Sequence, residues 1–567
     1  MSRALPIFAL SLTAALWALA GLATADVFRR CLALWAVLAG VCLLTEFIAR
    51  ATPPDETSKW IGRTLPADRL RFSASRRIFA AALGVIFLIA FWSWGSQVRG
   101  LVGERGLMPV GEQLAAARAA GNSFWQHPSL CWLASGDTSL IAQCWLGALL
   151  AIALAAGICP GACALLCWAL YLSLMSVAAE FGNFQWDALL LETALLAALW
   201  LPWKARPEWG RETPVQRIGR WLLWWLCFRL MIESGVVKLT WGDETWLGYS
   251  ALDFHFETQP LPLWTAWYAH QSPRWMLRAG SWITYFIEIA TPALLLAPPR
   301  WKSVRHGAAL ALIFLQAVIA TTGNYTFFNL LAAALCVPFL DDTFPFSRRL
   351  RTPPTELPKP SLWILAPAAA LALASAIWTF DGLSSAFGGV AAQNEKNERL
   401  RSEYALTGRV PPPPWHQSLR SFNGYGLFRT MTRSRPEIVV EGSADGINWR
   451  EYEFPCKAGD PYRRPALAAP HQPRLDWQMW FAALYPNGYA HLLERVLQRV
   501  LEAEPCVLAL LEKNPFPDAP PRYARLVFYD YHFTRFEDHS AAWWRRDLRG
   551  ATQPVSLESF RKPNPAR

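Results

Sequence analysis

The sequence lacks the short motifs on which most well-characterised chemistry depends. It contains no glycine-rich phosphate loop, no nucleophile elbow, no H-E-x-x-H helix and no C-x-x-C pair. A phosphate loop would cradle a nucleotide, an elbow would expose a catalytic serine, and the other two would bind zinc or exchange disulfides. The motif content therefore predicts no cofactor and no metal site.

Charged side chains are also scarce. Only 17% of the 567 residues are charged and 53% are hydrophobic, whereas soluble globular chains carry about 25% charged residues. The low charge argues against disorder as well, because disordered chains are rich in charge and poor in aromatic rings. Up to about residue 380 the hydrophobic residues fall in long blocks. The composition indicates a membrane part followed by a soluble part.

The hydrophobic blocks predict a polytopic α-helical membrane domain with about eleven spans. An apolar run of about 18 residues or more can cross a bilayer core of about 30 Å. The candidate spans are residues 5–25, 31–49, 77–97, 139–158, 161–180, 183–201, 219–238, 279–298, 306–322, 326–340 and 361–380. The first is followed at once by the second and has no convincing cleavage site, so we expect an anchor rather than a signal peptide.

Basic residues are distributed unevenly between the connecting segments. One alternate set holds 19 lysines and arginines and the other holds 7; the richer set is 50–77, 202–220, 299–306 and 341–361. Cytoplasmic loops carry such an excess, so the tail is expected in the periplasm of a bacterial inner-membrane protein, or in the endoplasmic reticulum lumen of a eukaryotic one. The net charge of +11 fits basic loops on anionic membrane lipid and requires no nucleic acid partner.

The tail has the mixed pattern of a soluble α+β domain. Residues 437–441 and 525–531 have strand composition, and Asp445-Gly446 is a hairpin signal before a returning strand at 449–454. Helices are expected at 476–484 and 489–511. The predicted organisation is two extra N-terminal spans (1–50), a membrane core (51–394) and an extracytoplasmic domain with a β-sandwich-like core (395–567). Within this last range, the stiff proline run 411–414 leads into the folded module.

The eleven cysteines do not form a disulfide framework. Most of them lie in or beside the apolar spans, where small packing residues are the ordinary interpretation. Cys456 and Cys506 are alone in the tail, and they could pair if the tail lies outside the cytoplasm.

Ionisable residues inside the predicted spans are the first candidates for a functional site. A charged side chain costs about 2.5–3.5 kcal/mol at the centre of a bilayer, so it persists where it is paired or lines a wet cavity. Gln185 and Glu192 lie on one helix face, and Asp187 lies on another. Arg229 and Glu233 have the i, i+4 spacing of a helical ion pair. A pair that only packs helices is the structural alternative.

A lysine and an outer loop complete the set of polar candidates. Lys238 could reach the membrane interface or turn into a cavity. The outer loop places four polar residues close together in the sequence, Asp253, His255, Glu257 and His270. His255 and Glu257 could ligate a metal, but no third ligand stands at helical spacing, so no metal is predicted.

Seven long stretches carry a resemblance to a known family. They are NFQWDALLLE from Asn183, FRLMIESGVVKLTWGDETW from Phe228, HFETQPLP from His255, TGNYTFFNLL from Thr322, EGSADGINWREYEF from Glu441, APHQPRLDWQMWFAAL from Ala469 and NPFPDAPPRYAR from Asn514. Over about residues 75 to 535, the chain resembles the lipase maturation factor family.

The resemblance implies a multipass membrane protein of the secretory pathway. Eukaryotic members assist the folding and assembly of secreted dimeric lipases in the endoplasmic reticulum. The composition of this chain favours a bacterium, where the secreted client proteins need not be lipases. We expect the exported tail to engage the client, and the stretch from Ala469 supplies five candidate contacts, His471, Arg474, Asp476, Trp477 and Trp480.

A fainter resemblance gives an alternative function. The stretch from Gly235 to Tyr249 is similar to a region of vitamin K-dependent carboxylases and related bacterial membrane proteins, in which the lysine matching Lys238 is catalytic. The alternative is a carboxylase-like membrane enzyme acting on a lipid, quinone or client side chain through Lys238. No quinone-epoxidising partner set is evident, so the resemblance carries over only the position. A non-enzymatic maturation factor is the favoured expectation.

Overall fold

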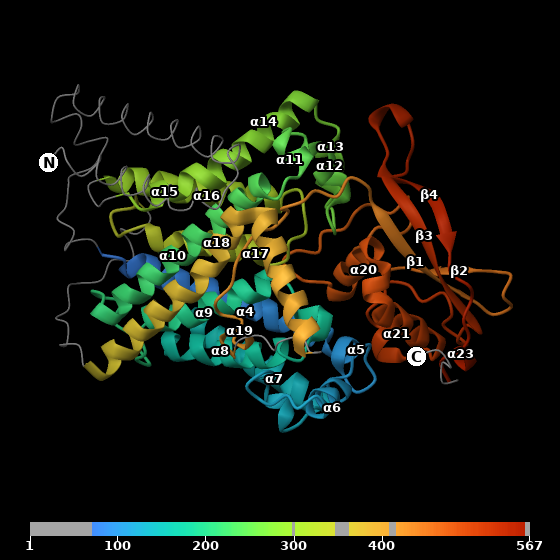
Figure 1. The fold of residues 1–567 in the computed structure, drawn as a ribbon, viewed down its shortest axis with the longest axis horizontal. Helices are drawn as coiled ribbons and strands as arrows, with labels where there is room; N and C mark the ends of the chain where they lie inside the picture. The colour runs from blue at the N-terminus through green and yellow to red at the C-terminus, as the bar shows by residue number, and fades with distance from the viewer. Residues whose placement is uncertain (1–70, 298–300, 346–361, 408–414, 562–567) are drawn as a thin grey trace.

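A computed structural model describes residues 71–297, 301–345, 362–407 and 415–561 (Figure 1). These residues form a helical membrane core, up to residue 407, and a C-terminal domain, residues 415–561, built around a small sheet. The two parts lie side by side. The spans predicted at 5–25 and 31–49 and the proline run 411–414 lie outside the described residues.

Four helices in the described part of the chain are long and apolar enough to cross a membrane. They are α4 (Ser73–Gly95), α7 (Asp137–Ala156), α16 (Lys302–Ala320) and residues Ala366–Ser402 of α18 (Leu362–Thr407). Two shorter apolar stretches accompany them, α8 (Pro160–Met175) and Phe328–Phe339, which begins with α17 (Phe328–Cys336). A membrane part with several apolar helices is therefore present, but the predicted total of about eleven spans is not confirmed.

Three other predicted spans in the described residues, 183–201, 219–238 and 279–298, do not form a single long apolar helix. The helix α9 (Gln185–Trp200) has only 16 residues, and α10 (Pro214–Thr240) carries buried charges along its 27 residues. The stretch predicted at 279–298 is divided into α14 (Arg274–Tyr285), a π-helical turn (Phe286–Ala290) and α15 (Thr291–Leu295). Single π-turns often mark functional positions in helices.

Close helix packing in the membrane core depends on a glycine. A Cβ atom at Gly84 of α4 would lie 2.4 Å from the backbone nitrogen of Ala155 near the end of α7. The two helices can approach this closely only because Gly84 has no side chain.

The helix α18 continues past the predicted domain boundary at residue 395. It is interrupted at Gly389, whose φ of 56° is not helical. A Cβ there would lie 2.2 Å from the carbonyl oxygen of Thr240, so a glycine is required where α18 meets the end of α10. Shorter helices complete the membrane core: α5 (Val98–Val102), α6 (Val110–Ala119), α11 (Glu244–Leu247), α12 (Ala251–Thr258) and α13 (Trp264–His270).

The C-terminal domain is α+β, as predicted, and contains one four-stranded antiparallel sheet in the order β2-β1-β3-β4. Its strands are β1 (Pro436–Ser443), β2 (Arg450–Tyr452), β3 (Tyr523–Phe533) and β4 (Trp544–Ala551). The predicted hairpin is confirmed, because Glu441 of β1 pairs with Glu451 of β2. The strand β4 was not expected from the sequence.

The expected β-sandwich-like core is wrong for the described residues. The helices α20 (Arg474–Leu484) and α21 (Ala490–Leu501) pack against the sheet, and Figure 1 shows them between the sheet and the membrane helices. They take the place of a second sheet. The helix predicted at 489–511 is divided into α21 and α22 (Pro505–Leu508); the remaining short helices are α19 (Trp415–Ser418) and α23 (Leu557–Arg561).

Candidate functional site: buried charges of the membrane core

The i, i+4 pair predicted on α10 is confirmed and belongs to a larger cluster. The Arg229 guanidinium lies 3.7 Å from the Glu233 carboxylate, and its Nη2 donates to the carboxylate of Glu192 on α9. None of these three side chains is accessible to solvent. Two carboxylates and one guanidinium leave excess negative charge and free acceptor oxygens, so the cluster needs further donors.

A segment that precedes the sheet supplies those donors. The Tyr425 hydroxyl donates to Glu192 at 2.7 Å, and the Tyr425 backbone N–H donates to Glu233 at 2.6 Å. In return, Arg229 Nη1 donates to the carbonyl oxygen of Asn423 at 2.7 Å. The cluster is therefore completed by the C-terminal domain, and its three charged side chains are closed off from solvent.

The Asp187 carboxylate forms a second buried contact with the C-terminal domain. Arg474 of α20 approaches it with both terminal nitrogens, each at 2.9 Å, and the Tyr171 hydroxyl also donates to it. The Arg474 guanidinium carbon lies 4.6 Å from the ring centroid of Trp94. As predicted, Asp187 points away from Glu192, and it holds α20 against the membrane core.

Two polar residues of the matching stretches make further contacts of the same kind. The Gln185 side chain accepts a hydrogen bond from the Gly426 backbone at 3.3 Å. Asn324 donates to the carbonyl oxygen of Ala466 at 2.8 Å and accepts from the backbone N–H groups of Ala468 and Ala469 at 2.8 and 3.0 Å. Both residues act on backbone groups of the C-terminal domain.

The predicted outer-loop cluster is divided between two environments. Glu257 faces the sheet, where it accepts from the Phe533 backbone N–H at 3.0 Å and lies 3.3 Å from His532. His270 lies 3.6 Å from the same carboxylate. His255 instead lies 3.3 Å from the Tyr325 hydroxyl inside the membrane core. Asp253 is partly buried on α12. These residues therefore do not form one site.

Lys238 turns inward, which was one of its two predicted positions. Its ammonium group donates to Glu288 at 2.6 Å and to the carbonyl oxygen of Ser234 at 2.9 Å. Glu288 belongs to the π-helical turn. The pair lines a cavity with a free volume of about 100 Å³, which His255 also lines and Asp187 does not.

The five residues predicted to contact a client do not form a free surface. Arg474, Asp476, Trp477 and Trp480 are buried, and His471 is partly buried. The Trp477 ring packs against Trp186 of α9 with centroids 4.7 Å apart. This prediction therefore needs correction, because these side chains already contact the membrane core or the interior of their own domain.

Asp476 has a structural role inside the C-terminal domain. Its carboxylate accepts hydrogen bonds from the backbone N–H groups of Cys456 and Lys457 at 2.7 and 2.9 Å. Burial outweighs these bonds and raises the pKa of Asp476 to about 6. The group is held by amides rather than by a hydrogen-bonded cation.

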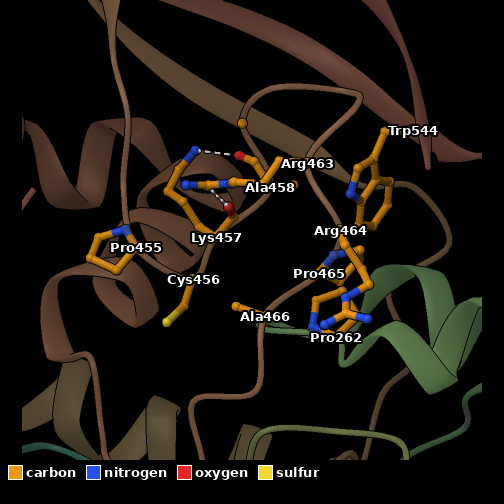
Figure 2. A pocket seen from close by; sticks show the side chains of 11 residues that line it. Pro262, Pro455, Cys456, Lys457, Ala458, Arg463, Arg464, Pro465, Ala466 and Trp544 are labelled. Atoms are coloured by element: carbon orange, nitrogen blue, oxygen red, sulfur yellow. Dashed lines mark hydrogen bonds between the residues drawn. The ribbon is translucent and has the colours of Figure 1, made fainter. Parts of the chain in front are cut away.

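A small hollow lies beside this segment. Figure 2 shows Lys457, Arg463 and Trp544 around it, together with Pro262 from the membrane core. The Lys457 ammonium donates to the carbonyl oxygen of Ala458 at 2.8 Å and pairs with Glu437 at 3.2 Å. The hollow has a free volume of about 10 Å³, and a single water needs about that much. It does not accommodate an organic ligand.

Metal and disulfide chemistry find no support in the described ranges. No group of three or more His, Cys, Asp or Glu residues there is arranged to hold a metal ion. Cys456 and Cys506 are both free thiols, so their possible pairing is not realised in this structure.

Comparison with known proteins identifies the family. The lipase maturation factor transmembrane domain matches residues 74–346, and the lipase maturation factor C-terminal domain matches residues 421–554. The chain belongs to the lipase maturation factor family. It is an integral membrane protein, as the family and its apolar helices indicate.

Individual relatives match both domains. The chain is 33% identical to lipase maturation factor 2 of Homo sapiens over 579 residues, covering 83% of this chain and 81% of the relative. It is 33% identical to lipase maturation factor 2 of Xenopus laevis over 580 residues, with the same coverage. Identity to human lipase maturation factor 1 is 30% over 526 residues, covering 86% of this chain and 89% of the relative. No solved structure matches the chain.

The family comparison gives no support to the carboxylase-like alternative. The relatives named above are maturation factors, and Lys238 is engaged in an ion pair.

Sequence analysis missed four residues that complete these contacts. Glu288 and Tyr171 lie inside predicted spans, and the cost of burying a carboxylate in a membrane could have singled out Glu288. Asn423 and Tyr425 lie outside every span, in a short loop with no local signal. Only the folded chain shows that they reach Glu192 and Arg229.

Proposed function

We propose that this chain is a membrane-anchored maturation factor that assists the folding or assembly of secreted proteins, with lipases as the first clients to test. The observation that carries the proposal is the match of both domains to proteins named lipase maturation factor, at 33% identity over 83% of the chain. In this proposal the protein acts by binding its client and not by covalent chemistry.

The contacts between the domains support a rigid platform. Arg474, Tyr425 and Asn423 of the C-terminal domain bond to buried charges of α9 and α10. Breaking a buried charge pair costs about 3–5 kcal/mol, so the C-terminal domain keeps a fixed position relative to the bilayer. A fixed domain presents the same surface to each client that reaches it.

Client contacts are assigned to exposed apolar residues, since the five residues first considered are largely buried. In the C-terminal domain, five large apolar side chains are at least 67% exposed. One is Leu548 in β4, and the other four lie in separate turns, loops and helix ends, Ile447, Tyr462, Leu467 and Tyr485. Burying an exposed apolar side chain against an apolar segment of an incompletely folded protein is favourable, because it removes apolar surface from water.

We also propose that the C-terminal domain lies outside the cytoplasm, in the periplasm of a bacterium or in the endoplasmic reticulum lumen of a eukaryote. The excess of basic residues in the opposite loops supports this orientation. Ile447→Cys should react with a membrane-impermeant maleimide in intact bacterial cells. Lys204→Cys, in an exposed basic loop, should react only after the membrane is opened. The reverse pattern would contradict the orientation.

The function can be tested by client rescue. Cells that lack this chain and express a secreted lipase should release several-fold more active lipase when the chain is restored. Changing the four exposed apolar residues of the turns, loops and helix ends to serine should abolish that gain, whereas Arg545→Ser, an exposed change in the same domain, should preserve it. No gain with the intact chain would contradict the proposal. Deleting the C-terminal domain is a poor test, because it would uncover the buried charges of α9 and α10.

A further inference from the structure

The cavity beside Lys238 is built from elements far apart in the sequence. It lies between α10, α12, α16 and α17, with Leu427 and Phe428 of the C-terminal domain closing part of its wall. Its free volume is about 100 Å³, whereas an apolar cavity of roughly 150 Å³ can hold benzene. The space therefore suits a compact group of a few heavy atoms.

Two amides in the wall of this cavity lack hydrogen-bond partners. Gln316 of α16 is 4% exposed and Asn329 of α17 is 6% exposed. Their side-chain oxygens, Oε1 and Oδ1, have no partner among the described residues. Buried polar groups are almost always paired, and an unpaired one is costly. A leucine would fill either position without that cost, so the two amides point to a missing partner.

The charges of the wall indicate that this partner is neutral. Lys238 and Glu288 are paired at 2.6 Å and cancel each other. An additional buried charge would find no counter-ion here and would carry its full desolvation cost. The rest of the wall is largely apolar and includes Met231, Ile319 and Phe328. The site therefore combines a neutral polar end with a surface suited to hydrocarbon.

We propose that this cavity binds the hydroxyl-bearing head of a neutral glyceride, a mono- or diacylglycerol, while the acyl chain lies outside this small volume. A hydroxyl group donates and accepts, so a glycerol head can pair with both the oxygens and the nitrogens of Gln316 and Asn329. A ligand with carbonyl acceptors alone would leave both amide oxygens unpaired, and a bare hydrocarbon would leave all four amide atoms unpaired.

The proposal can be tested on the purified full-length chain in detergent with three probes, 1-monoolein, glycerol and methyl oleate. Saturable binding of monoolein with a rise in Tm is expected, with no equal effect of glycerol or methyl oleate at the same concentration. An equal effect of glycerol would overturn the lipid assignment, and an equal effect of methyl oleate would overturn the role of the hydroxyl groups. No binding of monoolein would overturn the proposal.

Substitutions in the wall separate binding from folding. Gln316→Leu and Asn329→Leu should each weaken monoolein binding about tenfold, the loss expected for about 1.4 kcal/mol of hydrogen bonding. Each should also raise the Tm of the lipid-free protein, because it removes an unpaired buried amide. A lower Tm with unchanged binding would mean that water already satisfies these amides and would overturn the proposal.

A matched control is available elsewhere in the membrane core. Gln143 is 5% exposed, and its amide accepts from Ser173 at 2.6 Å and donates to Cys131 at 3.5 Å. Gln143→Leu should lower the Tm and leave monoolein binding unchanged. If the leucine variants do not fold, mass spectrometry of lipids extracted from the wild-type protein decides: enrichment of glycerides over the surrounding membrane supports the site, and its absence overturns it.

Discussion

The stretch of α10 from Arg229 to Lys238 carries buried charges, and its two ends differ in their surroundings. At one end, Arg229 and Glu233 are inaccessible to solvent and are completed by Asn423 and Tyr425 from the C-terminal domain. At the other end, Lys238 pairs with Glu288 but still borders an open cavity. The same helix therefore fastens a domain at one end and lines a cavity at the other.

This difference shows what a buried charge in a membrane helix does and does not indicate. The cost of burial says only that the charge must have a partner. At Arg229 the guanidinium and both carboxylates are inaccessible to solvent and bond to Asn423 and Tyr425, so the role is structural. At Lys238 a cavity with two unpaired amides remains nearby. A cavity lined by unpaired polar groups, rather than a buried charge alone, therefore distinguishes a binding site from a packing contact.

The largest expected loss of stability follows a change in the Arg229 cluster, which the C-terminal domain completes. Arg229→Met should lower the free energy of unfolding by about 3–5 kcal/mol, because it leaves the Glu192 and Glu233 carboxylates buried without a cation. Unfolding in mixed detergent, followed by tryptophan fluorescence, measures this loss. A loss below about 1 kcal/mol would mean that the cluster does not hold the fold together.

A buried carboxylate held by amides should respond to pH. The pKa of Asp476 is raised by burial from 3.8 to about 6, so the folded state favours the protonated acid. Its stabilising contribution is fully present below about pH 4 and is lost as the pH rises through 6, by about 3 kcal/mol in total.

The comparison with Asp476→Asn isolates this contribution. Asparagine keeps an oxygen acceptor for the backbone N–H groups of Cys456 and Lys457 but does not titrate over this range. The difference in stability between the two proteins should therefore change between pH 4 and 7 in detergent unfolding. A difference that stays constant with pH would contradict the assignment.

Removing one hydrogen-bond donor from the Arg229 cluster should cause an intermediate loss of stability. Tyr425→Phe loses the hydrogen bond to the buried Glu192 carboxylate, and bonds to charged groups are worth about 1.5–3 kcal/mol. Thermal unfolding should show the loss while the ring packing is kept. Wild-type stability in this variant would show that the hydroxyl group contributes nothing to the contact.

Removing the charge of Lys238, which borders the cavity, should destabilise the protein less than removing the charge of Arg229. Lys238→Met should cost about 1–2 kcal/mol, less than Arg229→Met, because it leaves one carboxylate, Glu288, that is 10% exposed, whereas Arg229→Met leaves two that are fully buried. The two variants should be compared in the same detergent. An equal or larger loss at Lys238 would remove the distinction between the two ends of α10.

Local features were predictable from the sequence, and long-range partners were not. The Asp445-Gly446 hairpin and the Arg229–Glu233 spacing depend on neighbours in the chain, and both are confirmed. The pairing of Asp187 with Arg474 joins residues 287 positions apart, and no local pattern encodes it. The sequence therefore predicts a client surface around Arg474, whereas the structure shows an internal contact there.

The predicted span count is not confirmed, for a related reason. A hydropathy pattern assumes that each apolar block forms one straight helix, but the block predicted at 279–298 is broken by a π-helical turn that carries Glu288. The predicted β-sandwich-like core failed because apolar strands indicate a covered face without saying what covers it. In this fold α20 and α21 cover the sheet, and β4 lies in a stretch that gave no strand signal.

The central claim is that buried charges of the membrane core fasten the C-terminal domain, and a double-mutant cycle between Asp187 and Arg474 tests it most directly. Asp187→Leu, Arg474→Met and the double variant should be unfolded in the same detergent. We expect each single change to cost about 3–5 kcal/mol and the double change to cost much less than their sum, giving a coupling above about 2 kcal/mol. Strictly additive losses would contradict the claim.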